Sequence, residues 1–280
     1  MTNAFLTRVD QLTQLRRSRI GFGLARIDRD VLDHLASASE FADIVLVGTS
    51  ELEGIKGFEV ILDKDPEKRI VSLLVKGEVE GIIRGTLDDF ITRELYTAMT
   101  GVQFSVEPAL IRTPRGEMFF ITPVSNREGW QKDERLDLAV GAADFLKDWG
   151  LDPDIAVFAP ARERTYYRTR TATDSVSLAI NTHYEEANSI AEALCNKGFK
   201  ARNWGIDLDK AATAGCNILV PVNGVVGNQI VRSILMCGGQ ILAAPCLGLP
   251  HCYEDNSRNE VDFIHHVRWL NAWINSRERP

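Results

Sequence analysis

The chain has 280 residues, 45% of them hydrophobic, and a formal net charge of −7 at pH 7. It can build one large core or two ordinary ones, and the acidic balance argues against a general nucleic-acid-binding surface. No apolar run reaches the roughly 20 residues of a membrane span, and the N-terminus lacks the order of a secretory signal. We therefore expect a cytoplasmic protein with neither nucleic-acid nor membrane partners.

The first half of the sequence alternates short β-rich runs with amphipathic stretches, which is the rhythm of an α/β fold. In the last amphipathic stretch of this half, Leu87, Phe90, Ile91, Leu95 and Ala98 share one helical face, and a glycine ends the helix. The predicted elements lie in order at 20–27, 29–40, 42–48, 58–62, 66–77, 79–85 and 86–101.

The segment 107–124 changes character, because two apolar runs flank the sequence "TPRG". Pro114 and Gly116 suit a turn, so the pattern predicts a β-hairpin that extends a mainly parallel sheet. The polar stretch 125–134 is the candidate linker, and the α/β rhythm restarts after it. The predicted elements there are 134–149, 154–160, 174–198, 216–222, 226–237, 240–245 and a terminal helix at 259–275.

Arg84 is placed where a ligand could bind, because it follows a predicted buried strand and precedes a helix. In open parallel sheets, ligands bind at the carboxyl ends of strands, and helix N-termini there present free N–H groups to anions. An ordinary interpretation is equally open. In it, Thr86 caps the helix, Asp88 and Asp89 favour the helix dipole, and Arg84 pairs with one of these two acids.

Two further segments allow both a functional and a structural interpretation. The glycine-containing turn around Asn223, Gly227 and Asn228 could admit a ligand, or could be only a tight strand-to-helix crossing. The segment 161–171 carries four arginines around two tyrosines, which suits a phosphate or carboxylate ligand as well as a solvated loop. No spacing typical of a metal site or a dinucleotide-binding fingerprint occurs, and the odd number of cysteines favours reduced thiols.

The segment "YEDNSRNEVDFIHHV" at 253–267 places Asp255, Asn256, Ser257 and Arg258 just before the predicted terminal helix. Helix capping accounts for the first three of these residues. It does not require Arg258, whose guanidinium could hold an anion.

These residues carry a resemblance to a known family. The segment 248–258 is similar to a stretch of the phosphate acetyl- and butyryltransferases, with matches at Gly248, Leu249, Asp255, Ser257 and Arg258. The segment 217–235 resembles another stretch of that family, and 79–95 resembles a third. These matches place Asn223, Gly227, Asn228 and Arg93 on family positions, while His251 replaces a lysine. Within this superfamily, the chain is similar to the methyltransferase-related proteins of methanogens called MtxX.

The resemblance implies a two-domain α/β fold like that of isocitrate and isopropylmalate dehydrogenases, with mainly parallel sheets, a central interdomain cleft and a homodimer. The implied first domain spans 1–128 and 253–280, and the second spans 129–252. The resemblance also implies catalytic roles for Ser257, Arg258 and Asp262. Substrate-binding roles follow for Arg93, Asn223, Gly227, Asn228 and His251. Arg84 is a further substrate-binding candidate from its position at the carboxyl end of a strand, and there it departs from the family, which has a small residue.

Three functions follow as hypotheses from this resemblance, and a direct methyltransferase ranks third because the sequence has no recognisable methyl-donor loop. The first is transfer of an acyl or related group between a phosphate-bearing and a CoA-like substrate, with no tightly bound cofactor and no metal. The second is an MtxX-like accessory or sensor protein of methanogenesis that binds a phosphorylated ligand without acyl transfer. Both require a small anionic ligand, but only the first requires a catalytic base, for which Asp262 is the candidate.

Overall fold

The computed structural model describes residues 2–256 and 262–277, with side chains from Phe5 onward. The described chain falls into two compact units. The terminal unit combines Ala4–Ser105 with the residues from Leu242 onward, and the middle unit is essentially Val106–Ile241. These divisions differ from the predicted positions after 128 and 252, because the hairpin at 109–121 joins the sheet of the middle unit.

The terminal unit is built on a five-stranded parallel sheet with the strand order β11-β4-β1-β2-β3. The chain starts at β1, moves outward to β2 and β3, and then returns to place β4 on the other side of β1. The strand order therefore reverses between β1 and β4. The elements of this unit are α1 (Thr2–Thr13), β1 (Arg19–Gly23), α2 (Arg29–Ala38), β2 (Asp43–Gly48), η1 (Ser50–Leu52), β3 (Glu59–Leu62), α3 (Pro66–Val75), β4 (Gly81–Ile83), α4 (Asp89–Thr100), β11 (Cys252–Glu254) and α10 (Ile264–Arg277).

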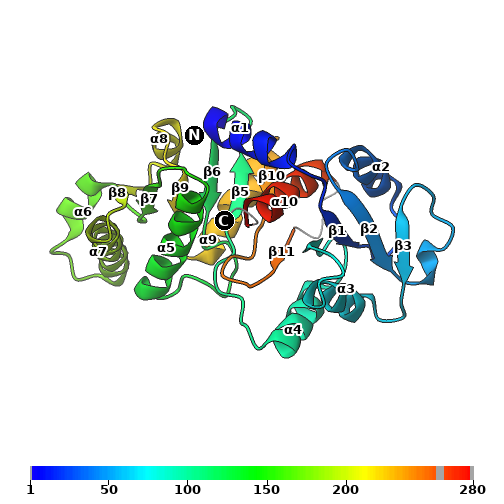
Figure 1. Cartoon of the computed structure of the whole chain (residues 1–280). Coiled ribbons are helices and arrows are strands. Elements are labelled where there is room, and N and C mark those ends of the chain that lie inside the picture. Colours follow the sequence, from blue (N-terminus) through cyan, green and yellow to red (C-terminus); the bar gives the residue numbers. More distant parts are fainter. Residues whose placement is uncertain (1, 257–261, 278–280) are drawn as a thin grey trace. The chain divides into compact units, whose positions relative to one another are not determined.

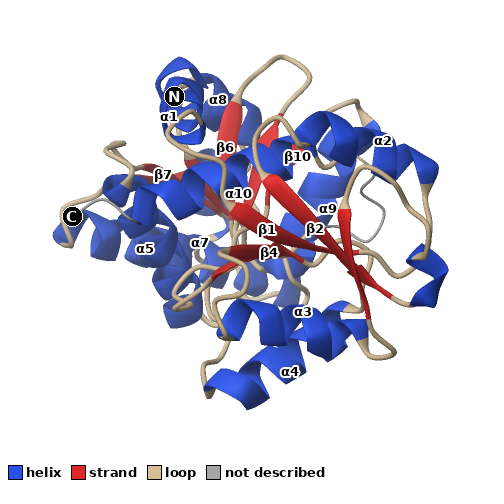
Figure 2. Cartoon of the chain, turned by 45° about the vertical axis from the view of Figure 1, so that its right-hand side comes forward, coloured by secondary structure: helices blue, strands red, loops and turns tan. Residues whose placement is uncertain are grey.

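Helices cover both faces of this sheet, which explains why its central strands are continuous buried runs. All residues of β4 and β11 are buried. Helices α3 and α4 pack side by side on one face, while α10 packs against α2, β4 and β11 on the other (Figures 1 and 2).

Aspartates begin three helices of this unit by accepting backbone N–H bonds that the first helical turn leaves unpaired. Asp28 caps α2, Asp65 caps α3, and Asp88 caps α4. The structure thus corrects the predicted cap of α4, because Thr86 lies two residues earlier and its Oγ1 accepts the Ala25 amide at 2.9 Å.

The buried face of α4 also differs from the predicted apolar face. Phe90 and Ile91 are 50% and 45% exposed, whereas Thr92 and Tyr96 are fully buried. Tyr96 packs edge-on against Phe104 and Tyr253, with ring centroids 5.4 and 5.7 Å away. Aromatic packing with β11, rather than aliphatic content, therefore sets the orientation of this helix.

The last helix is joined to the beginning of the chain by two buried asparagines. Asn271 donates to the carbonyls of Thr13 and Arg16 at 3.2 and 3.0 Å, and its Oδ1 accepts the Ser18 amide at 2.9 Å. Asn275 donates to the carbonyls of Leu12 and Arg16 at 2.9 and 3.0 Å. The carbonyls at the end of α1, which have no partner within that helix, are satisfied in this way.

The middle unit has a six-stranded sheet with the order β10-β5-β6-β9-β7-β8. Its hairpin pairs β5 with β6 in antiparallel fashion, and β6 then pairs parallel with β9, as the sequence predicted. The elements are β5 (Ala109–Arg112), β6 (Met118–Ile121), α5 (Lys132–Asp148), β7 (Asp154–Phe158), α6 (Glu163–Thr169), α7 (Ser175–Asn196), β8 (Lys200–Gly205), α8 (Leu208–Thr213), β9 (Ile218–Val220), α9 (Gly224–Met236) and β10 (Gln240–Ala243).

None of the helices within 2–256 and 262–277 combines the length and apolar content needed to cross a bilayer.

Candidate functional site

The carboxyl ends of β1 and β4 meet where the strand order of the terminal unit reverses, which is the usual ligand-binding edge of open α/β sheets. The backbone that follows β4 packs closely against the end of β1 there. Gly85 has a φ of +64°, and a Cβ added to it would lie 2.0 Å from the Gly23 carbonyl oxygen. The Thr86 amide donates to that same oxygen at 2.9 Å. Only glycine fits at position 85, and this contact fixes the backbone that follows β4.

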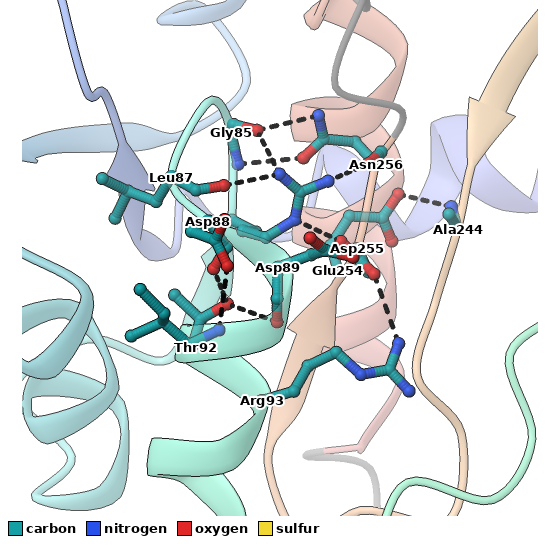
Figure 3. A network of polar contacts seen from close by, with 12 residues as sticks. Gly85, Leu87, Asp88, Asp89, Thr92, Arg93, Ala244, Glu254, Asp255 and Asn256 are labelled. Atoms are coloured by element: carbon teal, nitrogen blue, oxygen red, sulfur yellow. Dashed lines mark hydrogen bonds and ion pairs between the residues drawn. The ribbon is translucent and has the colours of Figure 1, made fainter.

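Arg84, the first residue after β4, is the centre of a polar network at this edge. Figure 3 labels its partners Gly85, Leu87, Asp255 and Asn256. Its side chain is 2% exposed. Nη1 donates to the carbonyls of Gly85 and Leu87 at 3.0 and 2.8 Å. Nε donates to Asp255 Oδ1, and Nη2 donates to the Asn256 carbonyl. The sequence placed Arg84 at the carboxyl end of its strand, but its acidic partner is Asp255 rather than Asp88 or Asp89.

Asn256 completes the connection between the loop after β4 and the loop after β11. Its Oδ1 accepts the Gly85 amide at 2.9 Å, and its Nδ2 donates to the Gly85 carbonyl at 3.1 Å. Asp255 and Asn256 therefore do not begin the last helix. That helix starts at Ile264, whose amide donates to Asp262 Oδ1 at 3.1 Å.

Arg93 presents a second guanidinium at the same edge, one turn into α4. Its Nη1 lies 3.5 Å from Asp255 Oδ2, and its side chain is 30% exposed. The guanidinium carbon lies 4.5 Å from the centroid of the Phe104 ring, which supports it by a cation–π contact. Arg84, Arg93 and Asp255 together carry a formal charge of +1. A partly exposed cation held beside a buried ion pair is suited to binding an oxyanion.

A second buried pair lies next to this network but involves α10. Glu254 and His266 are both fully buried. Glu254 Oε1 accepts the Ala244 amide at 2.6 Å and lies 2.7 Å from His266 Nδ1. Glu254 Oε2 and His266 Nε2 have no partner in the described structure. Burial raises the pKa of Glu254, and the hydrogen bond from His266 offsets only part of that effect.

This raised pKa predicts how stability depends on pH. The folded protein binds the Glu254 proton more tightly than the unfolded chain does, so this residue's contribution to the free energy of unfolding falls as pH rises above about 4.5. Relative to Glu254→Gln, which keeps the Oε1 acceptor, the wild type should lose stability between pH 5 and pH 8. Urea denaturation of both proteins at the two pH values measures this. An unchanged difference between the two proteins, or a relative gain by the wild type, would contradict the raised pKa of Glu254.

His251 lies away from this network, because it precedes β11 whereas Asp255 follows that strand. Its Nδ1 is 2.9 Å from the Tyr96 hydroxyl, and burial followed by the nearby Arg277 charge lowers its pKa. It lines a pocket of about 460 Å³ at the amino edge of the sheet, together with Lys76, Glu80 and Arg277 among others. The structure thus separates His251 from the cluster at the carboxyl edge.

Asn223, Gly227 and Asn228 belong to the middle unit and have local structural contacts. Asn223 caps α9 by accepting the Val226 amide at 3.0 Å. A Cβ on Gly227 would lie 2.0 Å from the Pro123 carbonyl oxygen. Asn228 donates to the Val124 carbonyl at 3.2 Å. These contacts support the structural interpretation of this turn, and substrate binding by the three residues stays a prediction.

Ser257 and Arg258 lie outside the described residues, so their predicted roles stay predictions, as does that of Asp262. Sequence reasoning missed Phe104, Glu254 and His266. Phe104 lies in an irregular segment, and Glu254 and His266 are 12 residues apart and belong to different elements, so no periodic pattern links them. No group of three or more His, Cys, Asp or Glu side chains that could hold a metal ion occurs among the described residues.

Sequence relatives and structural neighbours point to two groups of proteins, although no family model matches the chain. A protein of Methanosarcina mazei named "Putative methyltransferase mtx subunit X" is 27% identical over 260 residues, covering 91% of this chain and 90% of that protein. A phosphotransacetylase from Streptococcus pyogenes superposes with a TM-score of 0.66 and 15% identity over 98% of this chain and 99% of its own.

A second solved structure shows that this fold hosts other chemistry. The 4-hydroxythreonine-4-phosphate dehydrogenase from Klebsiella pneumoniae superposes with a TM-score of 0.56 and 12% identity, covering 92% of this chain and 99% of its own. The α/β fold with mainly parallel sheets and the resemblance to both the transacetylases and MtxX are therefore confirmed. The fold alone does not determine the reaction.

Proposed function

We propose that this chain is a group transferase that binds a phosphate-bearing substrate at the carboxyl edge of the terminal unit's sheet. The observation that carries the proposal is Arg93, a partly exposed cation supported by Phe104 and positioned beside the Arg84–Asp255 pair. The resemblance to phosphate acyltransferases, in fold and in segments 79–95 and 248–258, supports an acyl group as the group transferred.

The burial of each arginine decides its proposed role. Arg84 is enclosed, and its donors are directed to protein acceptors, so we assign it to positioning rather than to substrate. It holds Asp255 and Asn256, which lead directly into Ser257 and Arg258. Arg93 and Arg258 would bind the phosphate oxygens, and Ser257 would donate a hydrogen bond to developing negative charge. A single donor of this kind typically contributes about 10²- to 10³-fold to rate.

In the proposed reaction, the sulfur of a CoA-like thiol attacks the carbonyl carbon of an acyl phosphate. The carbon–oxygen bond to phosphate breaks, inorganic phosphate leaves, and a thioester forms. The thiol proton passes to a base, for which Asp262 is the candidate. Binding both substrates in one site converts a bimolecular encounter into an effectively unimolecular step.

An acyl-transfer assay with acetyl phosphate or butyryl phosphate and CoA tests this function. We expect thioester formation by the wild type and a loss of about 10²-fold or more in Arg258→Ala, since the anion loses a bidentate partner. Arg29→Ala, which removes an exposed arginine in the first turn of α2, is the matched control and should retain full turnover.

The names of the sequence relatives favour a second candidate, a methyltransferase-associated protein that binds a phosphorylated ligand without acyl transfer. The same assay separates the two functions. Stabilisation of the wild type by phosphate in a thermal melt, absent in Arg258→Ala and accompanied by no thioester, would support binding alone. No stabilisation by phosphate and no turnover would contradict both functions.

A further inference from the structure

Helix α6 of the middle unit concentrates positive charge in an otherwise acidic chain. The segment 162–170 contains four arginines and one glutamate. Arg162 pairs with Asp207 at 3.0 Å. Arg164 and Arg168 form no ion pair or hydrogen bond through their guanidinium groups in the described part of the chain. These two cations are therefore available to a ligand.

An aromatic ring lies on the same surface as these cations. Arg164, Tyr167 and Arg168 are spaced i, i+3 and i+4, so they occupy one face of the helix. The helix has no buried residue, and Tyr167 is 56% exposed. The Arg170 guanidinium carbon lies 5.4 Å from the Tyr167 ring centroid. We call Arg164, Tyr167, Arg168 and Arg170 the arginine–tyrosine face.

The opposite side of α6 packs against α7. This packing fixes the orientation of the arginine–tyrosine face. The Tyr166 ring stacks on Tyr184 with centroids 4.5 Å apart and an interplanar angle of 13°. The Tyr166 hydroxyl donates to Glu185 at 3.0 Å. Asn181 donates to the Thr169 carbonyl at 2.8 Å. The Tyr166 ring also contacts the Tyr167 ring, with centroids 5.5 Å apart and an interplanar angle of 57°, so the anchored Tyr166 supports Tyr167.

We propose that the arginine–tyrosine face binds a nucleotide that carries two or more phosphate groups. The base would stack on Tyr167, because aromatic stacking accepts any base, and the planar guanidinium groups of Arg164 and Arg168 would bind phosphate oxygens in bidentate fashion. Arg164 lies three residues before Tyr167 and four residues before Arg168, so its Cβ is about 5 to 6 Å from the Cβ of each on the helix surface. This spacing places one guanidinium beside the ring and the other beside the first guanidinium, which suits successive phosphates attached to a stacked nucleoside. A CoA-like molecule and a free nucleoside diphosphate share this chemistry.

Isothermal titration of the whole chain with ADP, pyrophosphate, CoA and dephospho-CoA tests the proposal. ADP should bind at least about tenfold more tightly than pyrophosphate, which has no base to stack. Arg164→Ala, Arg168→Ala and Tyr167→Ala should each weaken ADP binding about tenfold, while Tyr167→Phe should keep it. Arg115→Ala, an exposed arginine in the hairpin turn of the same unit, is the matched control and should have no effect.

The outcomes separate this site from the proposed transferase site. Equal affinity for pyrophosphate and ADP, or ADP binding that survives Arg168→Ala and Tyr167→Ala, would overturn the nucleotide site. CoA binding more tightly than dephospho-CoA would identify a CoA-like ligand, and equal affinity for ADP and CoA would identify a free nucleotide. Acyl transfer without ADP binding would contradict this inference alone, whereas ADP binding that is lost in Tyr167→Ala would stand even without acyl transfer.

Discussion

Arg84→Ala should destabilise the protein by about 3 to 5 kcal/mol of unfolding free energy, the largest stability effect that we expect at the site. The substitution leaves Asp255 without its buried partner and removes the Arg84 donors to the carbonyls of Leu87 and Asn256, while the Gly85 carbonyl keeps the donor from Asn256. Unsatisfied buried acceptors cost free energy beyond the lost ion pair itself. Urea denaturation monitored by tryptophan fluorescence measures the change.

Two further variants serve as controls for the stability measurement on Arg84→Ala. Arg115→Ala removes an exposed arginine and should change the free energy of unfolding by no more than about 0.5 kcal/mol. Arg84→Lys keeps the charge but not the planar fork, so it should recover only part of the loss. A change below about 1 kcal/mol in Arg84→Ala would show that the two loops are held by other contacts.

Arg93→Ala should have the opposite profile, with a large effect on activity and a small effect on stability. We expect kcat/KM for acyl transfer to fall by about 10²- to 10³-fold, because the substrate phosphate loses a positioned cation. The free energy of unfolding should change by less than about 1 kcal/mol, since the contact with Asp255 is long and partly exposed. Steady-state kinetics and denaturation of the same preparation provide both numbers.

Arg93→Lys distinguishes charge from geometry at this position. Lysine retains the positive charge but cannot bind phosphate through a planar fork or stack equally well on Phe104. Partial recovery of kcat/KM by lysine would support an anion-binding role. Full activity of Arg93→Ala with a large loss of stability would instead make Arg93 a structural residue and remove it from the proposed site.

The alternation of strands and helices was predictable from the sequence because it is a local property. The strands near 42–48 and 58–62 and the helices near 29–40 and 174–198 lie within a few residues of their predicted limits. The three-residue strand β11 was missed, because so short a run has no periodicity. The site depends on this strand, since β11 places Asp255 beside a residue 171 positions earlier in the chain.

The partner of Arg84 shows why local reasoning fails at this site. Asp88 and Asp89 were the predicted partners because they follow Arg84 closely in the sequence, but Asp88 is occupied in capping α4. The rule that ligands bind at the carboxyl ends of strands located Arg84 correctly, because that rule depends on topology. Which acid reaches the guanidinium depends on strand order, and strand order cannot be derived from hydrophobic pattern alone.

The late synthesis of β11 and of α10, the helix that the asparagines join to the end of α1, has a consequence for folding on the ribosome. Strand β11 and helix α10 are synthesised after the whole middle unit, so β4 remains an unpaired sheet edge throughout that interval. Exposed sheet edges promote intermolecular pairing. The nascent terminal unit is therefore most vulnerable to aggregation before its final segment emerges, and chaperone protection would matter most during that delay.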